Sequence, residues 1–292
     1  MKAAPFQYLR PTTLDDAIAA LAADEDARVI AGGQTLVPMM AMRLARPSTL
    51  VDIAHIDALK GIRETDSAIV IGAMTRQLEA ERSPLVQEKL PLLAAAFPWI
   101  GHHATRARGT VGGSVANADP AAEIPLVLVA LEGLVHWQGA QGAGEMAAAD
   151  FFTGPMMTEL ESQAIVTAIS LPVWTGGRIG VALHEVSQRR SDFAYVSAAA
   201  KVQCDEAGIC TRATVAIGGA CAYPVRLARA SHALTGVRIE AAMLEAILAE
   251  DIAALEIMTD GHASPAYRKR NAMALAKRAL VEAFENATGA KS

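Results

Sequence analysis

Two pairs of consecutive glycines are the residues of this 292-residue sequence whose type and spacing best suit a chemical task. Gly32-Gly33 ends a short apolar run, and Gly112-Gly113 stands between the hydroxyl groups of Thr110 and Ser114. Because glycine has no Cβ, successive backbone N–H groups can turn toward one concavity and bind an anion, and the hydroxyls can donate further hydrogen bonds. A single glycine pair is more often a tight turn. Two pairs together predict a ligand with two phosphates.

The familiar nucleotide-binding fingerprints are absent. Neither glycine pair fits the Gly-x-Gly-x-x-Gly pattern of dinucleotide folds, and no Gly-x-x-x-x-Gly-Lys-Ser/Thr loop occurs in the sequence. The sequence therefore lacks the key residues of a Rossmann dinucleotide site and of a P-loop. The sequence instead favours a pyrophosphate held between two loops that come from separate parts of the chain.

Other polar and aromatic residues suit supporting roles. His102-His103 lies beside two arginines and indicates either solvated side chains or charge next to a cofactor. Asp119 and Glu123 could form a carboxylate pair for acid–base chemistry, but their setting beside an apolar helix favours capping and hydrogen bonds to a cofactor. Phe193 and Tyr195 lie in a strand-like segment, which favours a place in a core over stacking against a cofactor, although stacking remains the alternative. Only three cysteines occur, which excludes a four-thiolate iron–sulfur cluster within this chain.

The elements that must position the glycine pairs follow from hydrophobic spacing. Thr13 can cap an amphipathic helix, and a short strand at Arg28–Ala31 then leads directly into the first pair. A helical turn at Met39–Leu44 and a second strand at Thr49–Ile53 complete a compact opening unit. The elements expected next are a strand at Ala68–Ile71, helices at Pro91–Ile100 and Ile124–Leu131, and an exposed hairpin or loop at Gln138–Gly144.

A linker at Trp174–Gly177 precedes a region in which strands are followed by helices. The strands expected there are Val181–Val186, Tyr195–Gln203 and Thr211–Ile217, and the helices are Glu240–Leu248 and Ala266–Phe284. Strands that precede helices indicate a separate α+β domain.

Composition and charge narrow the class of protein. Hydrophobic residues make up 52% of the chain and charged residues 20%, which is typical of a folded globular protein. A net charge of −5 provides no basic field for a phosphate backbone, so no nucleic-acid partner is expected. The apolar runs are too short to cross a bilayer, and residues 1–10 lack the apolar region of a secretory signal. We therefore expect no membrane span and a cytoplasmic protein.

Four motifs, in order along the chain, carry a resemblance to a known family. They are Ala31–Pro38 with Leu50–Ile53, Arg106–Ser114 with Ala118–Pro125, Phe151–Gly154, and Arg189–Ala194. They resemble the FAD-binding medium subunits of the molybdenum hydroxylases, of the carbon monoxide dehydrogenase and xanthine dehydrogenase type. The resemblance covers nearly the whole chain.

The resemblance implies an α+β fold. Two FAD-binding subdomains of the vanillyl-alcohol-oxidase (PCMH) type would span residues 1–57 and 58–176, and a C-terminal α+β domain would span residues 177–292. FAD would lie extended between the subdomains. The linker expected near Gly176 agrees with the last boundary.

The resemblance also implies a set of cofactor contacts, with no catalytic and no metal residue among them. The expected contacts to FAD are Ile30, Ala31, Gly32, Gly33, Gln34, Thr35, Leu36, Ile100, Thr110, Val111, Gly112, Gly113, Ser114, Asp119, Glu123, Val166 and His184. Glu123 would hydrogen-bond FAD, and His184 would be a basic residue beside the flavin. Ser114 replaces the asparagine that is common in relatives, which keeps a donor but shortens its reach.

The implied function is electron transfer. The chain would move electrons from the 2Fe–2S clusters of a small subunit to an external acceptor, while a large molybdopterin subunit would hydroxylate the substrate. A dimer of such heterotrimers is the expected assembly. Two alternatives remain open, a free-standing flavin reductase or dehydrogenase of the same fold and a nucleotide-binding assembly protein with no redox role.

Overall fold

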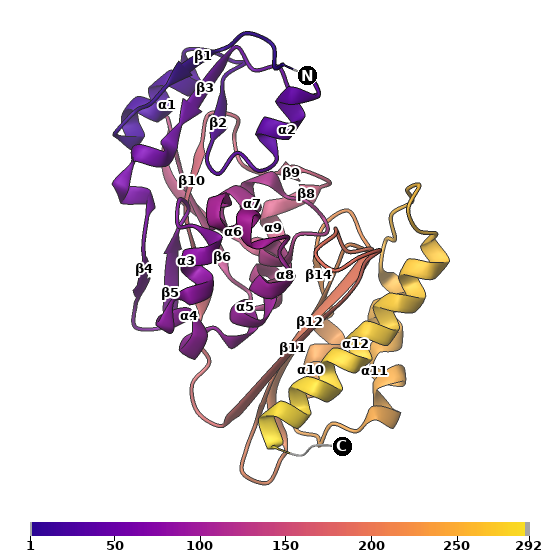
Figure 1. The fold of residues 1–292 in the computed structure, drawn as a ribbon. Coiled ribbons are helices and arrows are strands. Elements are labelled where there is room, and N and C mark those ends of the chain that lie inside the picture. The colour runs from indigo at the N-terminus through magenta and orange to yellow at the C-terminus, as the bar shows by residue number, and fades with distance from the viewer. Residues whose placement is uncertain (1, 290–292) are drawn as a thin grey trace.

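The structure, a computed structural model, describes residues 2–289. Residue 1 of the first expected unit and residues 290–292 of the last lie outside this range. The chain builds three groups of elements, which follow one another from indigo to yellow in Figure 1.

The N-terminal group is a small parallel sheet with two helices. Its elements are β1 (Gln7–Leu9), α1 (Leu14–Ala22), β2 (Arg28–Ile30), α2 (Leu36–Ala41) and β3 (Thr49–Asp52), with the strand order β1-β3-β2. The Thr13 hydroxyl accepts a hydrogen bond from the backbone N–H of Asp16 at 3.2 Å, so the expected cap of α1 is confirmed. The expected start of the next helix at Met39 is wrong, since α2 already begins at Leu36. Pro38 is tolerated there because the first turn of a helix does not need its N–H groups.

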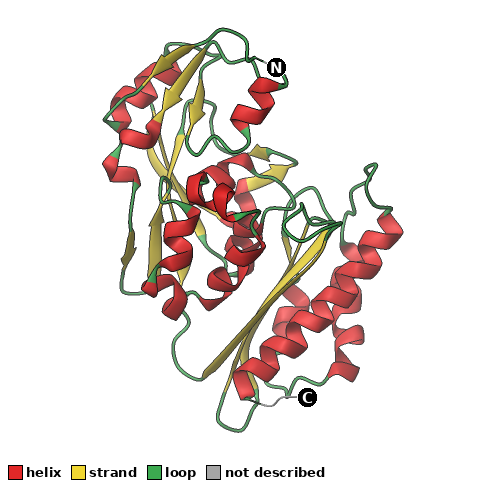
Figure 2. Ribbon diagram, viewed as in Figure 1, coloured by secondary structure: helices red, strands yellow, loops and turns green. Residues whose placement is uncertain are grey.

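The middle group is a five-stranded sheet with the strand order β4-β5-β10-β6-β7, covered by helices (Figure 2). The strands are β4 (Ile62–Glu64), β5 (Ala68–Gly72), β6 (Leu134–Gly139), β7 (Gly142–Ala147) and β10 (Ile165–Pro172), and β8 (Phe152–Gly154) pairs separately with β9 (Met157–Thr158). The helices are α3 (Gln77–Arg82), α4 (Pro84–Lys89), α5 (Pro91–Ala96), α6 (His103–Arg108), α7 (Val111–Asn117), α8 (Glu123–Ala130) and α9 (Ala148–Phe151). Short 3₁₀ helices occupy Ile53–His55, Asp57–Leu59 and Phe97–Trp99.

For this group of elements, one predicted element is confirmed and another is shorter than predicted. The hairpin expected at Gln138–Gly144 is confirmed by the pairing of β6 with β7. The helix expected at Pro91–Ile100 is shorter, because α5 ends at Ala96 and a 3₁₀ turn follows. Pro98 has no N–H to continue an α-helical ladder.

The C-terminal group is an antiparallel sheet with helices on one face. Its strands are β11 (Arg178–Val186), β12 (Val196–Cys204), β13 (Cys210–Gly218) and β14 (Val225–Arg226), and its helices are α10 (Ala228–Ala233), α11 (Ala241–Ala254) and α12 (Pro265–Thr288). The expected α+β arrangement is confirmed, with α11 and α12 longer than the sequence indicated. Figure 1 shows α12 lying along β11 and β12.

The sheet of the C-terminal group also packs against the middle group. Leu183, Ala199 and Ala216 are buried in the same hydrophobic core as α5 and α8, while their strand neighbours belong to the core under α12. Alternation along each strand divides these side chains between the two faces. No helix within residues 2–289 is long and apolar enough to cross a membrane.

Candidate functional site

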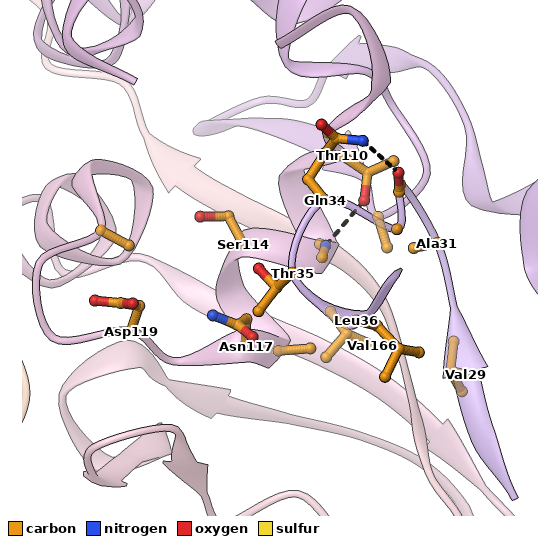
Figure 3. Close-up of a pocket in the computed structure, with 18 of the residues that line it drawn as sticks. Val29, Ala31, Gln34, Thr35, Leu36, Thr110, Ser114, Asn117, Asp119 and Val166 are labelled. Atoms are coloured by element: carbon orange, nitrogen blue, oxygen red, sulfur yellow. Dashed lines mark hydrogen bonds between the residues drawn. The ribbon is translucent and has the colours of Figure 1, made fainter. Parts of the chain in front are cut away.

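A cavity of about 700 Å³ lies where the three groups of elements meet. Its walls come from the loop before α2, from α7 and the start of α8, from β10, and from the loop that follows β11. In the close-up of Figure 3, the labelled Thr35, Ser114, Asn117 and Asp119 lie around one space between these segments. Its size suits a large cofactor.

The first glycine pair presents free backbone donors to this cavity. Gly33 has a φ of +70°, a conformation that glycine adopts without strain. Within the described part of the chain, the backbone N–H groups of residues 32–35 donate to no protein acceptor. The Gln34 side chain instead donates through Nε2 to the Gly32 carbonyl at 3.1 Å, as Figure 3 shows. The loop therefore has the geometry of an anion-binding nest.

The second glycine pair is not the open loop that we expected. It forms the first turn of α7, and its N–H groups are already used within the protein. Gly112 donates to the Ala73 carbonyl at 2.9 Å, and Gly113 donates to the Thr110 hydroxyl at 3.1 Å. The prediction of a second nest is therefore wrong, because Thr110 caps the helix and takes the donor that an anion would need. The side chains of Ser114 and Asn117 remain as polar groups on this wall.

Gly32 and Gly112 also allow neighbouring backbone segments to approach closely, which the sequence motif alone does not show. A Cβ at Gly32 would lie 2.5 Å from the Arg108 carbonyl oxygen and 2.9 Å from the Gly109 Cα. Gly112 packs in the same way against Ala73. The two glycine loops are thus in direct backbone contact, and a side chain at Gly32 would push them apart.

Arg106 fixes the wall on which Ile100 lies. Its guanidinium donates to the Ile100 carbonyl at 2.9 Å and to the Gly101 carbonyl at 3.1 Å. The same group pairs with Glu81 at 2.8 Å, and its side chain is 12% exposed. Arg106 is therefore a positioning residue for the cavity rather than a free cation.

The structure brings most of the expected contact residues together. Those that line the cavity are Ala31, Gly32, Gly33, Gln34, Thr35, Leu36, Ile100, Thr110, Gly112, Gly113, Ser114, Asp119, Glu123 and Val166. Ile30 and Val111 lie behind the wall, and Val111 is fully buried in the core of the middle group.

His184 does not reach the cavity. Its side chain lies on the face of β11 that packs on α12, where Nε2 is 2.8 Å from Glu282 Oε2. Burial lowers the pKa of His184, and Glu282 opposes that effect. The expectation of a basic residue beside the flavin at this position is corrected, because strand alternation turns His184 toward the helix and its neighbours Leu183 and Glu185 toward the middle group.

Two carboxyl groups, those of Asp119 and Glu123, line the cavity, and a third, that of Glu185, lies near Glu123 outside the lining. Burial raises the pKa of Glu123 to about 7 and also raises the pKa of Asp119. Asp119 accepts a hydrogen bond from the Ala121 N–H at 2.9 Å within the turn before α8, but the N-cap of that helix is Ala122 and receives no side-chain hydrogen bond, so the expected capping role is not observed. The sequence reading missed Glu185, whose pKa is raised to about 8 by burial and by the nearby Glu123.

Several other cavity residues were missed or misjudged. Phe193 was expected in a core, but it is 74% exposed and lies at the rim of the cavity with Asp192. Asn117, Met156 and Glu161 also contribute to the walls without a recognisable motif. A strand-like sequence pattern does not reveal that Phe193 is exposed beside a cavity, because the position of this loop is set by the tertiary structure.

The fold and the cavity together define a flavin-binding protein, and comparison with known proteins agrees. Residues 4–174 match the FAD binding domain in molybdopterin dehydrogenase, and residues 181–283 match the CO dehydrogenase flavoprotein C-terminal domain. The chain belongs to the family of FAD-binding medium subunits of the molybdopterin-dependent dehydrogenases. It is thus a subunit of the oxidoreductase class, and the expected fold is confirmed.

Relatives of known function match along almost their whole length. The chain is 35% identical to the nicotine 6-hydroxylase medium subunit of Paenarthrobacter nicotinovorans, over 97% of this chain and 99% of that protein. It is 34% identical to the carbon monoxide dehydrogenase medium chain of Afipia carboxidovorans, over 95% and 96% of the two chains.

Solved structures show the same arrangement. Carbon monoxide dehydrogenase from Hydrogenophaga pseudoflava superposes with a TM-score of 0.93 at 33% identity, covering 98% of this chain and 100% of that chain. Quinoline 2-oxidoreductase from Pseudomonas putida 86 superposes with a TM-score of 0.92 at 32% identity, covering 99% and 100%.

Proposed function

We propose that this chain holds one non-covalent FAD and passes electrons from the 2Fe–2S clusters of a small partner subunit to an external acceptor. The observation that carries the proposal is that the backbone N–H groups of residues 32–35 have no protein acceptor within residues 2–289 and belong to a loop that lines a cavity of cofactor size. Unpaired donors beside a cavity suit the pyrophosphate of FAD.

The residues present fit the cofactor. The nest at residues 32–35 would hold phosphate, and Ser114 would add a hydroxyl donor from α7. Ile100 and Val166 would supply apolar contact, and Glu123 would offer a hydrogen bond. FAD, when bound, supplies one- and two-electron chemistry, while the chain fixes its position and surroundings.

The assembly that we propose contains a large molybdopterin subunit and the small iron–sulfur subunit, arranged as a dimer of heterotrimers in the cytoplasm. Support comes from relatives that are named as medium subunits and from neighbouring structures of carbon monoxide dehydrogenase. Within this chain, we propose functional units at residues 1–57, 58–176 and 177–292.

Acid precipitation of the purified complex tests the cofactor part of the proposal. Because no contact calls for a covalent bond, acid should release all of the flavin, and chromatography of the supernatant should show FAD in a one-to-one ratio to this chain. Flavin that stays with the precipitate, or FMN in the supernatant, would contradict the proposal. A matched sample of the complex with Gly33→Val should contain little FAD.

A further inference from the structure

Two buried polar atoms without partners lie side by side on the sheet of the C-terminal group. They are Glu185 Oε1 on β11 and Ser197 Oγ on β12, and neither has a hydrogen-bond partner within the described residues. Glu185 and Ser197 are register partners, so both side chains lie on the same face of the sheet. Ser197 is only 1% exposed. Buried polar atoms normally have hydrogen-bond partners, and a protonated Glu185 carboxyl group or a bound water would satisfy this pair.

This face of the sheet packs on the middle group, which carries the cavity residue Glu123. Leu183, two residues before Glu185, is buried in the core of the middle group. Helix α8 packs against β12 and β13, and its first residue, Glu123, lines the cavity. Gly218 on β13 is opposite Ser197, and a Cβ there would lie 2.6 Å from Ser197 Oγ. The glycine leaves room for the hydroxyl group.

The surrounding charges favour a retained proton. Burial, together with the nearby negative charge of Glu123, raises the pKa of Glu185 to about 8, and Asp119 adds a second negative neighbour to Glu123. Arg106 is the cation that acts on Glu123, but it is paired with Glu81. Asp192 lines the cavity as another acid. Like charges that are buried together cannot all ionise, so one carboxyl group keeps its proton near neutral pH.

The opposite face of β11 carries its own charges. His184, Glu282 and Arg278 interact there beside α12, on the far side of the strand from Glu185. Because they face another helix, substitutions among them provide a control that leaves the cavity side intact.

Proton supply is a chemical need of the proposed function, on which this inference rests. A complete reduction of FAD consumes two electrons and two protons, and electrons from iron–sulfur clusters bring no protons with them. We propose that Glu185 and Ser197 complete, with Glu123, a proton-holding site that reaches the cavity through Glu123. Its proton passes through Glu123 to the cavity during reduction and is replaced from water. Glu185 and Ser197 act through Glu123 and are therefore positioning residues.

Infrared spectroscopy of the full chain without FAD tests whether the proton is held. Exposed glutamates are ionised at pH 7, so a carboxylic acid band at that pH reports a buried protonated group. Glu123→Gln and Glu185→Gln should each remove at least about half of the band, and Ser197→Ala should shift its frequency. Glu282→Gln, on the other face of β11, should leave it unchanged. A wild-type spectrum without the band, or a band that survives both cavity-side variants, would overturn the inference.

A second measurement links the site to the flavin. In the FAD-loaded complex, flavin reduction by substrate can be followed by visible absorbance after rapid mixing in H₂O and in D₂O. Glu185→Gln should slow this reduction and change its solvent isotope effect, while Glu282→Gln should leave both as in wild type. An equal rate and an equal isotope effect in wild type and Glu185→Gln would reject proton supply by this site. If the complex carries no flavin, the proposed function fails, and the infrared result still decides whether the chain holds the proton.

Discussion

Glycine serves three different physical purposes around the cavity. Gly33 adopts a positive φ that turns N–H groups toward the cavity. Gly32 and Gly112 have no room for a Cβ, because another backbone segment lies against each of them. Gly113 lies inside a capped helical turn and donates to Thr110. The glycines of one motif therefore meet different structural requirements. A substitution at each position should disturb the protein by a different mechanism.

Gly32→Ala should separate the two glycine loops. The added methyl group would overlap the Arg108 carbonyl oxygen, and overpacking of this kind costs about 1–3 kcal/mol of stability. We expect FAD affinity to fall at least about tenfold, equivalent to ~1.4 kcal/mol, in a titration that follows flavin fluorescence. Gly261→Ala is the matched control, since a Cβ there has no heavy atom within 4 Å. Unchanged affinity in Gly32→Ala would show that the contact between the loops is dispensable.

Thr110→Ala should destabilise the start of α7. Thr110 Oγ1 accepts the Gly113 N–H, and loss of such a cap costs about 1 kcal/mol. Urea denaturation should show a lower midpoint for Thr110→Ala and a nearly normal one for Thr110→Ser, which retains the hydroxyl group. Equal midpoints for alanine and serine would mean that the cap contributes nothing.

A buried arginine connects the last helix to the segments around the cavity. Arg268 in the first turn of α12 donates to the carbonyl oxygens of Tyr195 at 2.5 Å and Gly219 at 2.6 Å, and it pairs with Asp260 at 2.5 Å. Gly219 in turn donates to the Pro120 carbonyl at 2.7 Å, directly after Asp119 in the chain. The position of α12 is thereby coupled to the turn that carries the cavity acids.

Arg268→Met should be strongly destabilising. The methionine has a similar length but leaves two buried carbonyl groups and Asp260 without their donor, which typically costs about 3–5 kcal/mol. Arg229→Met is the control, because the Arg229–Glu250 pair is exposed and should contribute less than about 1 kcal/mol. Comparison of urea midpoints measures both changes. Similar losses in the two variants would contradict a special role for Arg268.

The stability of the folded protein should depend on pH through the ionisation of Asp260. Its hydrogen bond with Arg268 lowers the pKa of Asp260 from 3.8 to about 2. A depressed pKa in the folded state means that the contribution is complete above about pH 4 and is lost as the pH falls through about 2. Asp260→Asn should therefore be less stable than wild type at neutral pH, with a gap that narrows at about pH 3. A gap that stays constant in thermal unfolding would exclude this linkage.

The cavity belongs to the whole molecule, since no single group of elements encloses it. The nest comes from the N-terminal group, α7 and β10 come from the middle group, and the rim residue Phe193 comes from the C-terminal group. Among its described residues, the chain has no group of three or more His, Cys, Asp or Glu side chains that could hold a metal ion.

Removal of FAD from the complex should separate the two halves of the reaction. If this chain is the electron exit, the stripped complex should still bleach its iron–sulfur absorbance when substrate is added anaerobically, but it should lose turnover with the physiological acceptor. Addition of FAD should restore turnover. Substrate hydroxylation by the isolated chain would refute the subunit role, and full turnover without FAD would refute the exit role.

Much of this protein follows from local properties of the sequence. The capped helix at Thr13, the strand that leads into Gly32 and the hairpin near Gly139 depend on neighbours within a few residues, so hydrophobic spacing and turn residues were sufficient to predict them. The motifs around the two glycine pairs were enough to indicate FAD and the family.

Other features were decided only by contacts between distant segments. Whether an N–H group is free depends on which acceptor reaches it, and Thr110 and Ala73 take those of the second pair. The face of β11 to which His184 turns depends on the register of the sheet and on the position of α12. Glu185 meets Glu123 only because β11 packs against the middle group. Hydrogen-bond satisfaction and burial are properties of the folded whole, so no local pattern contains them.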